Sequence, residues 1–154
     1  MAVCAVALGL LVFGVLATWV WFNRTTEQEI AEWILRAGGT VEFETDFGQV
    51  SFFDTVDGPA GDLPVVAVDL TGASVESIGK VARLLHLRWL SVDGIPVGKS
   101  ELARITRLDN LTELHLTMCS LRDEDLTVLF DMQGLESLDL SDNEITDEGA
   151  RTHR

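Results

Sequence analysis

The sequence predicts an α/β solenoid of about four stacked strand–helix units, preceded by an N-terminal helix and hairpin cap and by a single transmembrane helix. Aliphatic residues recur at fixed offsets with spacings of 22, 24 and 24 residues, and a second apolar set lies between them at helical spacing. Residues 2–22 contain no charged side chain. We divide the chain into a transmembrane anchor (1–24), the cap (25–62) and the repeats (63–154), the last of which is incomplete.

The predicted anchor fits one membrane crossing. A helix over its 21 residues rises about 31 Å, and the hydrocarbon core of a bilayer is about 30 Å thick. Trp19 and Trp21 lie at its end, where amphipathic rings favour the interface. The alternative is a signal peptide cleaved at Val15-Leu16-Ala17, but the N-terminus has no Lys or Arg and the apolar run continues beyond this motif. We therefore expect an uncleaved, single-pass membrane protein, with the side of the repeats left open.

Charge and cysteine content restrict the partners. All 25 carboxylates follow Arg24, where only 10 Lys and Arg remain, so this part has a net charge of about −15. An anionic surface repels phosphate backbones, and we expect no nucleic-acid partner. Cys4 would lie in lipid and Cys119 in the soluble part, which excludes an intrachain disulfide. Because the sequence has no CxxC motif and no Cys/His cluster, we expect neither a metal nor a cofactor.

The cap has helix and hairpin signals. Residues 26–29, Thr-Glu-Gln-Glu, have the pattern of a capping box, and apolar residues follow on one helical face between 30 and 35. Gly38-Gly39 provides a left-handed end to this helix. Apolar and polar residues then alternate from 40 to 44, which predicts a strand pairing with residues 50–53 across a turn.

The repeats have large apolar residues at offsets 0, 3, 5 and 10 of each copy. These sixteen positions are Val65, Val68, Leu70 and Val75; Leu87, Leu90, Val92 and Val97; Leu111, Leu114, Leu116 and Leu121; and Leu135, Leu138, Leu140 and Ile145. The second apolar set is Ile78, Val81 and Leu84; Leu102, Ile105 and Leu108; and Leu126, Leu129 and Met132. Each unit is thus a short strand followed by a helical turn, and stacking the units buries both apolar sides.

Offsets 2, 4 and 6 then point outward, onto the concave face. Those residues are Ala67, Asp69 and Thr71; Trp89, Ser91 and Asp93; Glu113, His115 and Thr117; and Ser137, Asp139 and Ser141. Offset 4 places Ser91, His115 and Asp139 on neighbouring strands, but an open sheet offers neither an oxyanion hole nor a pocket that excludes water, so we expect no enzyme. Trp89 is either an exposed anchor for a partner or a cover over the cap.

The repeats resemble the leucine-rich-repeat family, and the chain is similar to its bacterial, planctomycete-type, membrane-anchored members. The similar elements are the N-terminal span, the segment Ile34-Leu-Arg-Ala-Gly-Gly-Thr-Val41, and the form Leu138-Asp-Leu140-Ser…Ile145-Thr-Asp-Glu-Gly149. At offset 8 the family has Asn or Cys; Cys119 and Asn143 conform, whereas the first two copies have Ala73 and Ile95. The fourth repeat stops at residues 150–154, before its helix, so its last rung is either truncated or covered by a partner.

The resemblance implies a binding scaffold more than any one activity. We expect a membrane-tethered module that binds a protein or peptide on the concave face. The candidate contact residues are Trp89, Ser91, Asp93, Glu113, His115 and Asp139. The alternative is a structural envelope protein that self-associates through the anchor and the uncapped last rung, without a separate ligand.

Overall fold

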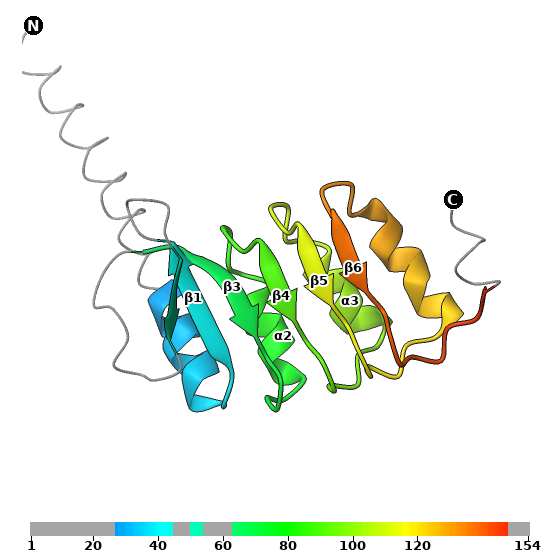
Figure 1. Ribbon diagram of the computed structural model, residues 1–154, viewed down its shortest axis with the longest axis horizontal. Helices are drawn as coiled ribbons and strands as arrows, with labels where there is room; N and C mark the ends of the chain where they lie inside the picture. Colours follow the sequence, from blue (N-terminus) through cyan, green and yellow to red (C-terminus); the bar gives the residue numbers. More distant parts are fainter. Residues whose placement is uncertain (1–26, 45–49, 54–62, 148–154) are drawn as a thin grey trace, which may run out of the picture.

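The computed structural model describes residues 27–44, 50–53 and 63–147 (Figure 1). The predicted anchor (2–22), the motif Val15-Leu16-Ala17, the first residues of the capping box and the chain after residue 147 lie outside the described residues. Within the described ranges, no helix has the length and apolar character needed to cross a membrane.

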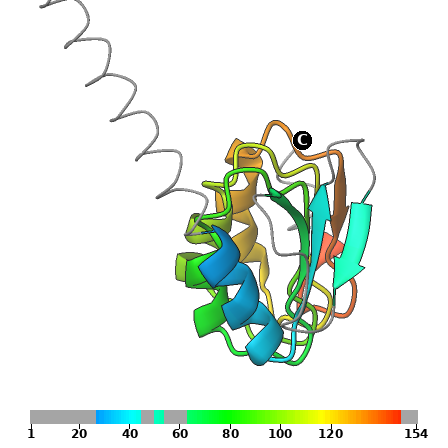
Figure 2. The ribbon, with the colours of Figure 1, turned by 90° about the vertical axis from the view of Figure 1, so that its left-hand side faces the viewer.

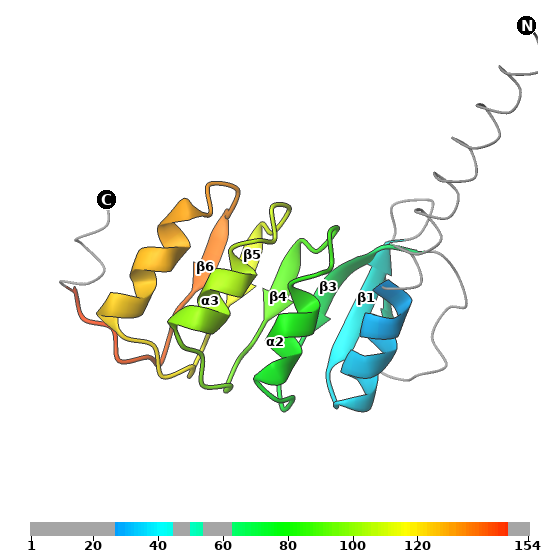
Figure 3. The same ribbon diagram turned by 180° about the vertical axis from the view of Figure 1, so that it is seen from behind.

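The described chain forms two layers, a six-stranded sheet and a row of helices on one of its faces (Figures 2 and 3). The strands run in the order β2-β1-β3-β4-β5-β6. Their bounds are β1 Thr40–Glu44, β2 Val50–Phe53, β3 Val65–Asp69, β4 Trp89–Ser91, β5 Glu113–His115 and β6 Ser137–Asp139. Helical residues 27–36 come first, followed by α2 Glu76–Val81, α3 Lys99–Ile105 and the 3₁₀ helix η1 Asp123–Asp131.

The repeats stack in parallel register. Strands β3 to β6 pair in parallel, and Val68, Leu90, Leu114 and Leu138 occupy one row across them. All members of the second apolar set are buried except the half-buried Met132. The predicted α/β solenoid is confirmed over three strand–helix units, β3–α2, β4–α3 and β5–η1, and the strand β6 of a fourth, with the difference that the helical segment of the third unit is a 3₁₀ helix.

Two of the sixteen predicted core positions are exposed. Val75 is 40% exposed because the first repeat is two residues shorter, and α2 begins directly after Val75. Leu138 is also 40% exposed, since no described residue of a following rung packs against β6. The other fourteen are buried or half-buried.

The cap adds antiparallel strands to the parallel sheet. Strand β1 pairs antiparallel with both β2 and β3, which confirms the predicted hairpin. The preceding helix ends at Arg36 and is followed by Gly38, whose φ of 91° is left-handed, as predicted. At Gly39 an added Cβ would lie 2.6 Å from the Asp69 carbonyl oxygen, so the turn packs directly against β3.

A buried carboxylate also joins the cap to both ends of the first repeat. Glu27 is only 6% exposed; its Oε2 accepts a hydrogen bond of 3.4 Å from the Val65 N–H, and its Oε1 lies 3.0 Å from Nδ1 of His86. Buried carboxylates need such partners because burial without them is costly. This contact holds the first helix against the repeats.

Candidate binding surface

Two rows of side chains cross the sheet on the face turned away from the helices. The strand register aligns Glu42, Ala67, Trp89, Glu113 and Ser137 in one row and Thr40, Asp69, Ser91, His115 and Asp139 in the other. We call these ten residues, with Asp93 next to them, the concave face. The register confirms the predicted alignment of the repeat positions at offsets 2 and 4 and shows that the cap strand β1 continues both rows.

The concave face is anionic. It contains five carboxylates, one histidine and no Lys or Arg. The basic residues of the described chain all lie outside the six strands, namely Arg36, Lys80, Arg83, Arg88, Lys99, Arg104, Arg107 and Arg122. Of these, only Arg88, directly before β4, lines the groove described next. Basic groups are thus excluded from the strand rows, whereas both signs of charge occur on the helical side.

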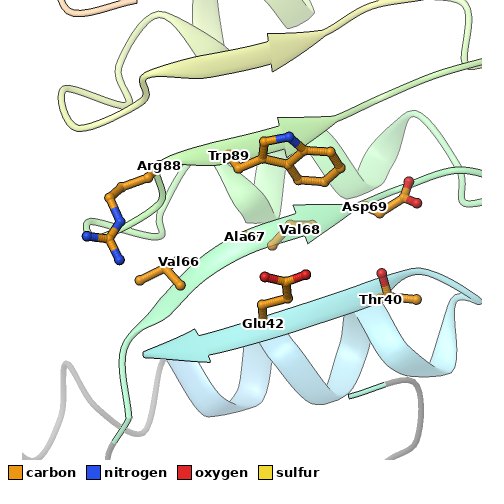
Figure 4. A pocket seen from close by; sticks show the side chains of 8 residues that line it. All are labelled: Thr40, Glu42, Val66, Ala67, Val68, Asp69, Arg88 and Trp89. Atoms are coloured by element: carbon orange, nitrogen blue, oxygen red, sulfur yellow. The ribbon is translucent and has the colours of Figure 1, made fainter. Parts of the chain in front are cut away.

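A groove of about 460 Å³ lies at the junction of the cap and the repeats (Figure 4). It is lined by Thr40, Glu42, Val66, Ala67, Val68, Asp69, Arg88 and Trp89. Its depth has a local cause in the sequence. Ala67 has the smallest side chain of its row and stands between Glu42 and Trp89, so the two larger side chains flank a hollow above β3.

The polar groups around the groove are unequally satisfied. Arg88 Nη2 lies 3.1 Å from Glu44 Oε2, so its charge is already balanced. Asp69 Oδ1 accepts a 2.7 Å hydrogen bond from the Thr71 N–H. Among the described residues, the Glu42 carboxylate has neither a hydrogen-bond donor nor an ion-pair partner. The groove therefore keeps a net negative charge from Glu42 and Asp69.

Trp89 forms one wall of this groove. Its ring is half-buried and lies against His115, with centroids 5.3 Å apart and planes inclined by 45°. On the side of the cap, the open groove separates Trp89 from β1. Of the two alternatives for Trp89, the structure thus shows a partly exposed ring supported by the third repeat, not a cover packed over the cap.

Two of the candidate residues stabilise the carboxyl ends of β4 and β5. Ser91 is 3% exposed, and its hydroxyl donates to Asp93 Oδ2 over 3.1 Å. The other oxygen of Asp93 accepts a 2.7 Å hydrogen bond from the Thr117 N–H of the next rung. Ser91 accordingly offers almost no surface to a partner, although its position in the row is the predicted one.

The remaining candidates form a cluster around His115. Its Nε2 lies 2.8 Å from Glu113 Oε1, while its Nδ1 is 4.0 Å from Asp139 Oδ2. Hydrogen bonds from the Ser141 hydroxyl and N–H, followed by the weaker attraction of His115, hold the pKa of Asp139 below its usual value. The hydrogen bonds do not connect Ser91 to His115, so this row is not joined as a nucleophile–base pair would be.

Some groove residues were missed in the sequence analysis. Glu42 and Arg88 were not candidates, because only offsets 2, 4 and 6 counted from Val65 were treated as outward. The alternation of Glu42 with Val41 and Phe43 is the signal that could have found Glu42. As for metals, no three His, Cys, Asp or Glu side chains converge as ligands within the residues that the structure describes.

Comparison with known proteins identifies the repeats. The sequence model of the leucine-rich repeat matches residues 108–130 and 133–152. Among solved structures, an internalin from Listeria monocytogenes aligns at 23% identity with a TM-score of 0.35, over 48% of this chain and 28% of the internalin chain. No curated protein matches the sequence significantly. The match supports leucine-rich repeats over these two stretches, which together make up less than a third of the chain.

Proposed function

We propose that this chain is a membrane-tethered protein-interaction module, which binds a protein or peptide on the concave face. The groove beside Trp89 carries the proposal, since it combines an aromatic wall, an apolar floor and a carboxylate without a described partner. Binding sites in proteins usually combine a concave, mostly apolar surface with a few polar groups of this kind. Leucine-rich repeats serve generally as binding scaffolds, and partly exposed Trp side chains are frequent interface hot spots.

A photo-crosslinking experiment tests the binding surface. The crosslinking residue p-benzoylphenylalanine is placed at Thr71 or Ser137, which are exposed on the strand side, and at Glu76 on α2 as the helical-side control. In cells of the source organism we expect a discrete adduct from the two strand-side positions and none from the control. Trp89→Ala should abolish the adduct. Adducts from Glu76 alone, or none from Thr71 and Ser137, would refute concave-face binding.

The membrane tether is tested separately. Its support is the uncharged run of residues 2–22, which has the length of one crossing. A C-terminal tag is followed after cell fractionation, and protease is added to intact and lysed cells. We expect the tag in the membrane fraction, and the protease result assigns the side of the membrane. A tag found only in the soluble fraction would contradict the anchor and favour cleavage at Val15-Leu16-Ala17.

A structural, self-associating role is the second candidate. It is supported by exposed apolar side chains in the third and fourth repeats, where Leu138 is 40%, Phe130 45% and Met118 63% exposed. Large apolar side chains left exposed in this way can become buried in an interface between proteins. Analytical ultracentrifugation of the detergent-solubilised full chain distinguishes the two: this role requires a mass of two or more chains, and that mass should fall after Leu138→Glu. A single-chain mass would exclude it.

A further inference from the structure

We propose that the groove between β1 and β4 is a subsite for an arginine side chain of the partner. This inference rests on the proposed function and specifies the chemistry of the segment bound there. It follows from the size of the hollow above Ala67, from the charge that remains in it, and from the pairing of an aromatic wall with a carboxylate.

The dimensions suit a flat group. Glu42 and Trp89 occupy one row with Ala67 between them, so they are two strand spacings apart. Neighbouring strands are about 4.8 Å apart, which separates the two backbones by about 10 Å. Figure 4 shows Glu42 and Trp89 on opposite sides of Ala67, with the space between them open. A side chain entering from the solvent can lie across Ala67 and touch both walls.

The remaining charge selects a cation. Arg88 lines one end of the groove but is paired with Glu44 at 3.1 Å, so it does not neutralise Glu42. Asp69 adds a second carboxylate at the other end. An acidic ligand would be repelled by both groups, and a neutral ligand would desolvate Glu42 without balancing its charge. A basic side chain is the one type that compensates this carboxylate.

The combination of walls favours arginine over lysine. A guanidinium is planar, stacks on aromatic faces and donates two parallel hydrogen bonds to one carboxylate, whereas an ammonium is a strongly hydrated point charge. In this groove the indole of Trp89 offers the stacking surface, and across the floor Glu42 offers two carboxylate oxygens that no described residue binds. Both contacts can be made at once by a group that spans the gap above Ala67.

Selection from a phage-displayed library of random dodecapeptides tests the subsite. The full chain, solubilised in mild detergent, is immobilised through a C-terminal tag, and the affinity of the best enriched peptide is then measured by fluorescence anisotropy. We expect the enriched peptides to share an arginine. Glu42→Gln should weaken the best peptide at least tenfold, and so should replacement of its arginine by citrulline, which keeps the shape and removes the charge. Glu76→Gln makes the same charge change on α2 and should alter the affinity less than twofold.

Other results overturn the proposal. Peptides enriched without a basic residue, enrichment of lysine in place of arginine, failure to enrich any peptide, or an unchanged affinity of Glu42→Gln would each reject the arginine subsite. Unaltered far-UV circular dichroism of Glu42→Gln confirms that its fold is intact, which is expected because this carboxylate has no described partner. Concave-face adducts in cells would still support the proposed function after such a failure, whereas their absence would reject that function itself.

Discussion

Asn143 is predicted to be the main polar tie between the third and fourth rungs. Its Oδ1 accepts hydrogen bonds from the N–H groups of Cys119 and Leu121, at 2.9 and 3.0 Å. Its Nδ2 donates to the carbonyl oxygens of Leu116 and Leu140, at 2.7 and 2.9 Å. In Asn143→Ala these four backbone groups lose the partner that the side chain supplied.

The magnitude of the loss follows from these contacts. One intramolecular hydrogen bond contributes about 0.5–1.5 kcal/mol net, so four would contribute about 2–6 kcal/mol. Asn143 is half-buried, and water can reach part of the vacated site. We therefore expect Asn143→Ala to lower the free energy of unfolding by about 2–3 kcal/mol, a large share of the roughly 5–15 kcal/mol typical of a folded domain.

Urea unfolding of the full chain in mild detergent, followed by far-UV circular dichroism, measures the global effect. Hydrogen exchange measures the local one, because the amides of Cys119 and Leu121 should exchange faster in the variant. The matched control is Glu136→Ala, an exposed residue of the same rung for which the structure shows no side-chain hydrogen bond; we expect a change below about 0.5 kcal/mol there. If Asn143→Ala is as stable as this control, or both amides keep their protection, the reasoning is wrong.

Three further predictions concern buried positions. Gly39→Ala should lower the free energy of unfolding by at least about 2 kcal/mol, since its Cβ would meet the Asp69 carbonyl oxygen at 2.6 Å. The control Gly134→Ala meets nothing closer than 3.7 Å and should be tolerated. Equal urea midpoints for the two variants would contradict the predicted clash at Gly39. Ser77→Ala should raise the free energy of unfolding by about 0.5–1 kcal/mol, because the fully buried Ser77 hydroxyl has no hydrogen-bond partner in the described structure; a destabilised variant would show that the hydroxyl has a role. Burial raises the pKa of the Cys119 thiol to about 11. Because only the thiolate reacts, its alkylation by iodoacetamide at pH 8 should be at least about a hundredfold slower in the folded chain than in urea. Peptide mass spectrometry measures both rates, and similar rates would refute the burial of this thiol.

The repeats were predictable because the same spacing of apolar residues occurs in four successive copies of the sequence. Offsets 3 and 5 are large aliphatic residues in every copy, and a one-residue error of register would expose all of them. Val75 was mispredicted for a specific reason. The two-residue deletion was visible, but not whether the shorter loop would shift α2 or the residue before it.

The groove could not be predicted from the same pattern. Its two walls belong to different parts of the chain, Trp89 to the second repeat and Glu42 to the cap. The antiparallel pairing of β1 with β3 has no counterpart among the repeats, so no offset predicts which cap residue faces Ala67. The burial of Ser91 could not be predicted from the repeat pattern either, because it depends on the larger side chains that the neighbouring strands place around it.

The junction of cap and repeats therefore has two roles that constrain each other. Glu27 and Gly39 hold the cap against β3 on the helical side and at the turn, and the groove lies on the opposite face of the same strands. A shift of β1 along β3 would move Glu42 away from Ala67 and dismantle the groove while leaving the repeats intact. The arginine subsite thus depends on the packing of the cap, and Gly39→Ala should weaken peptide binding even under conditions in which the repeats stay folded.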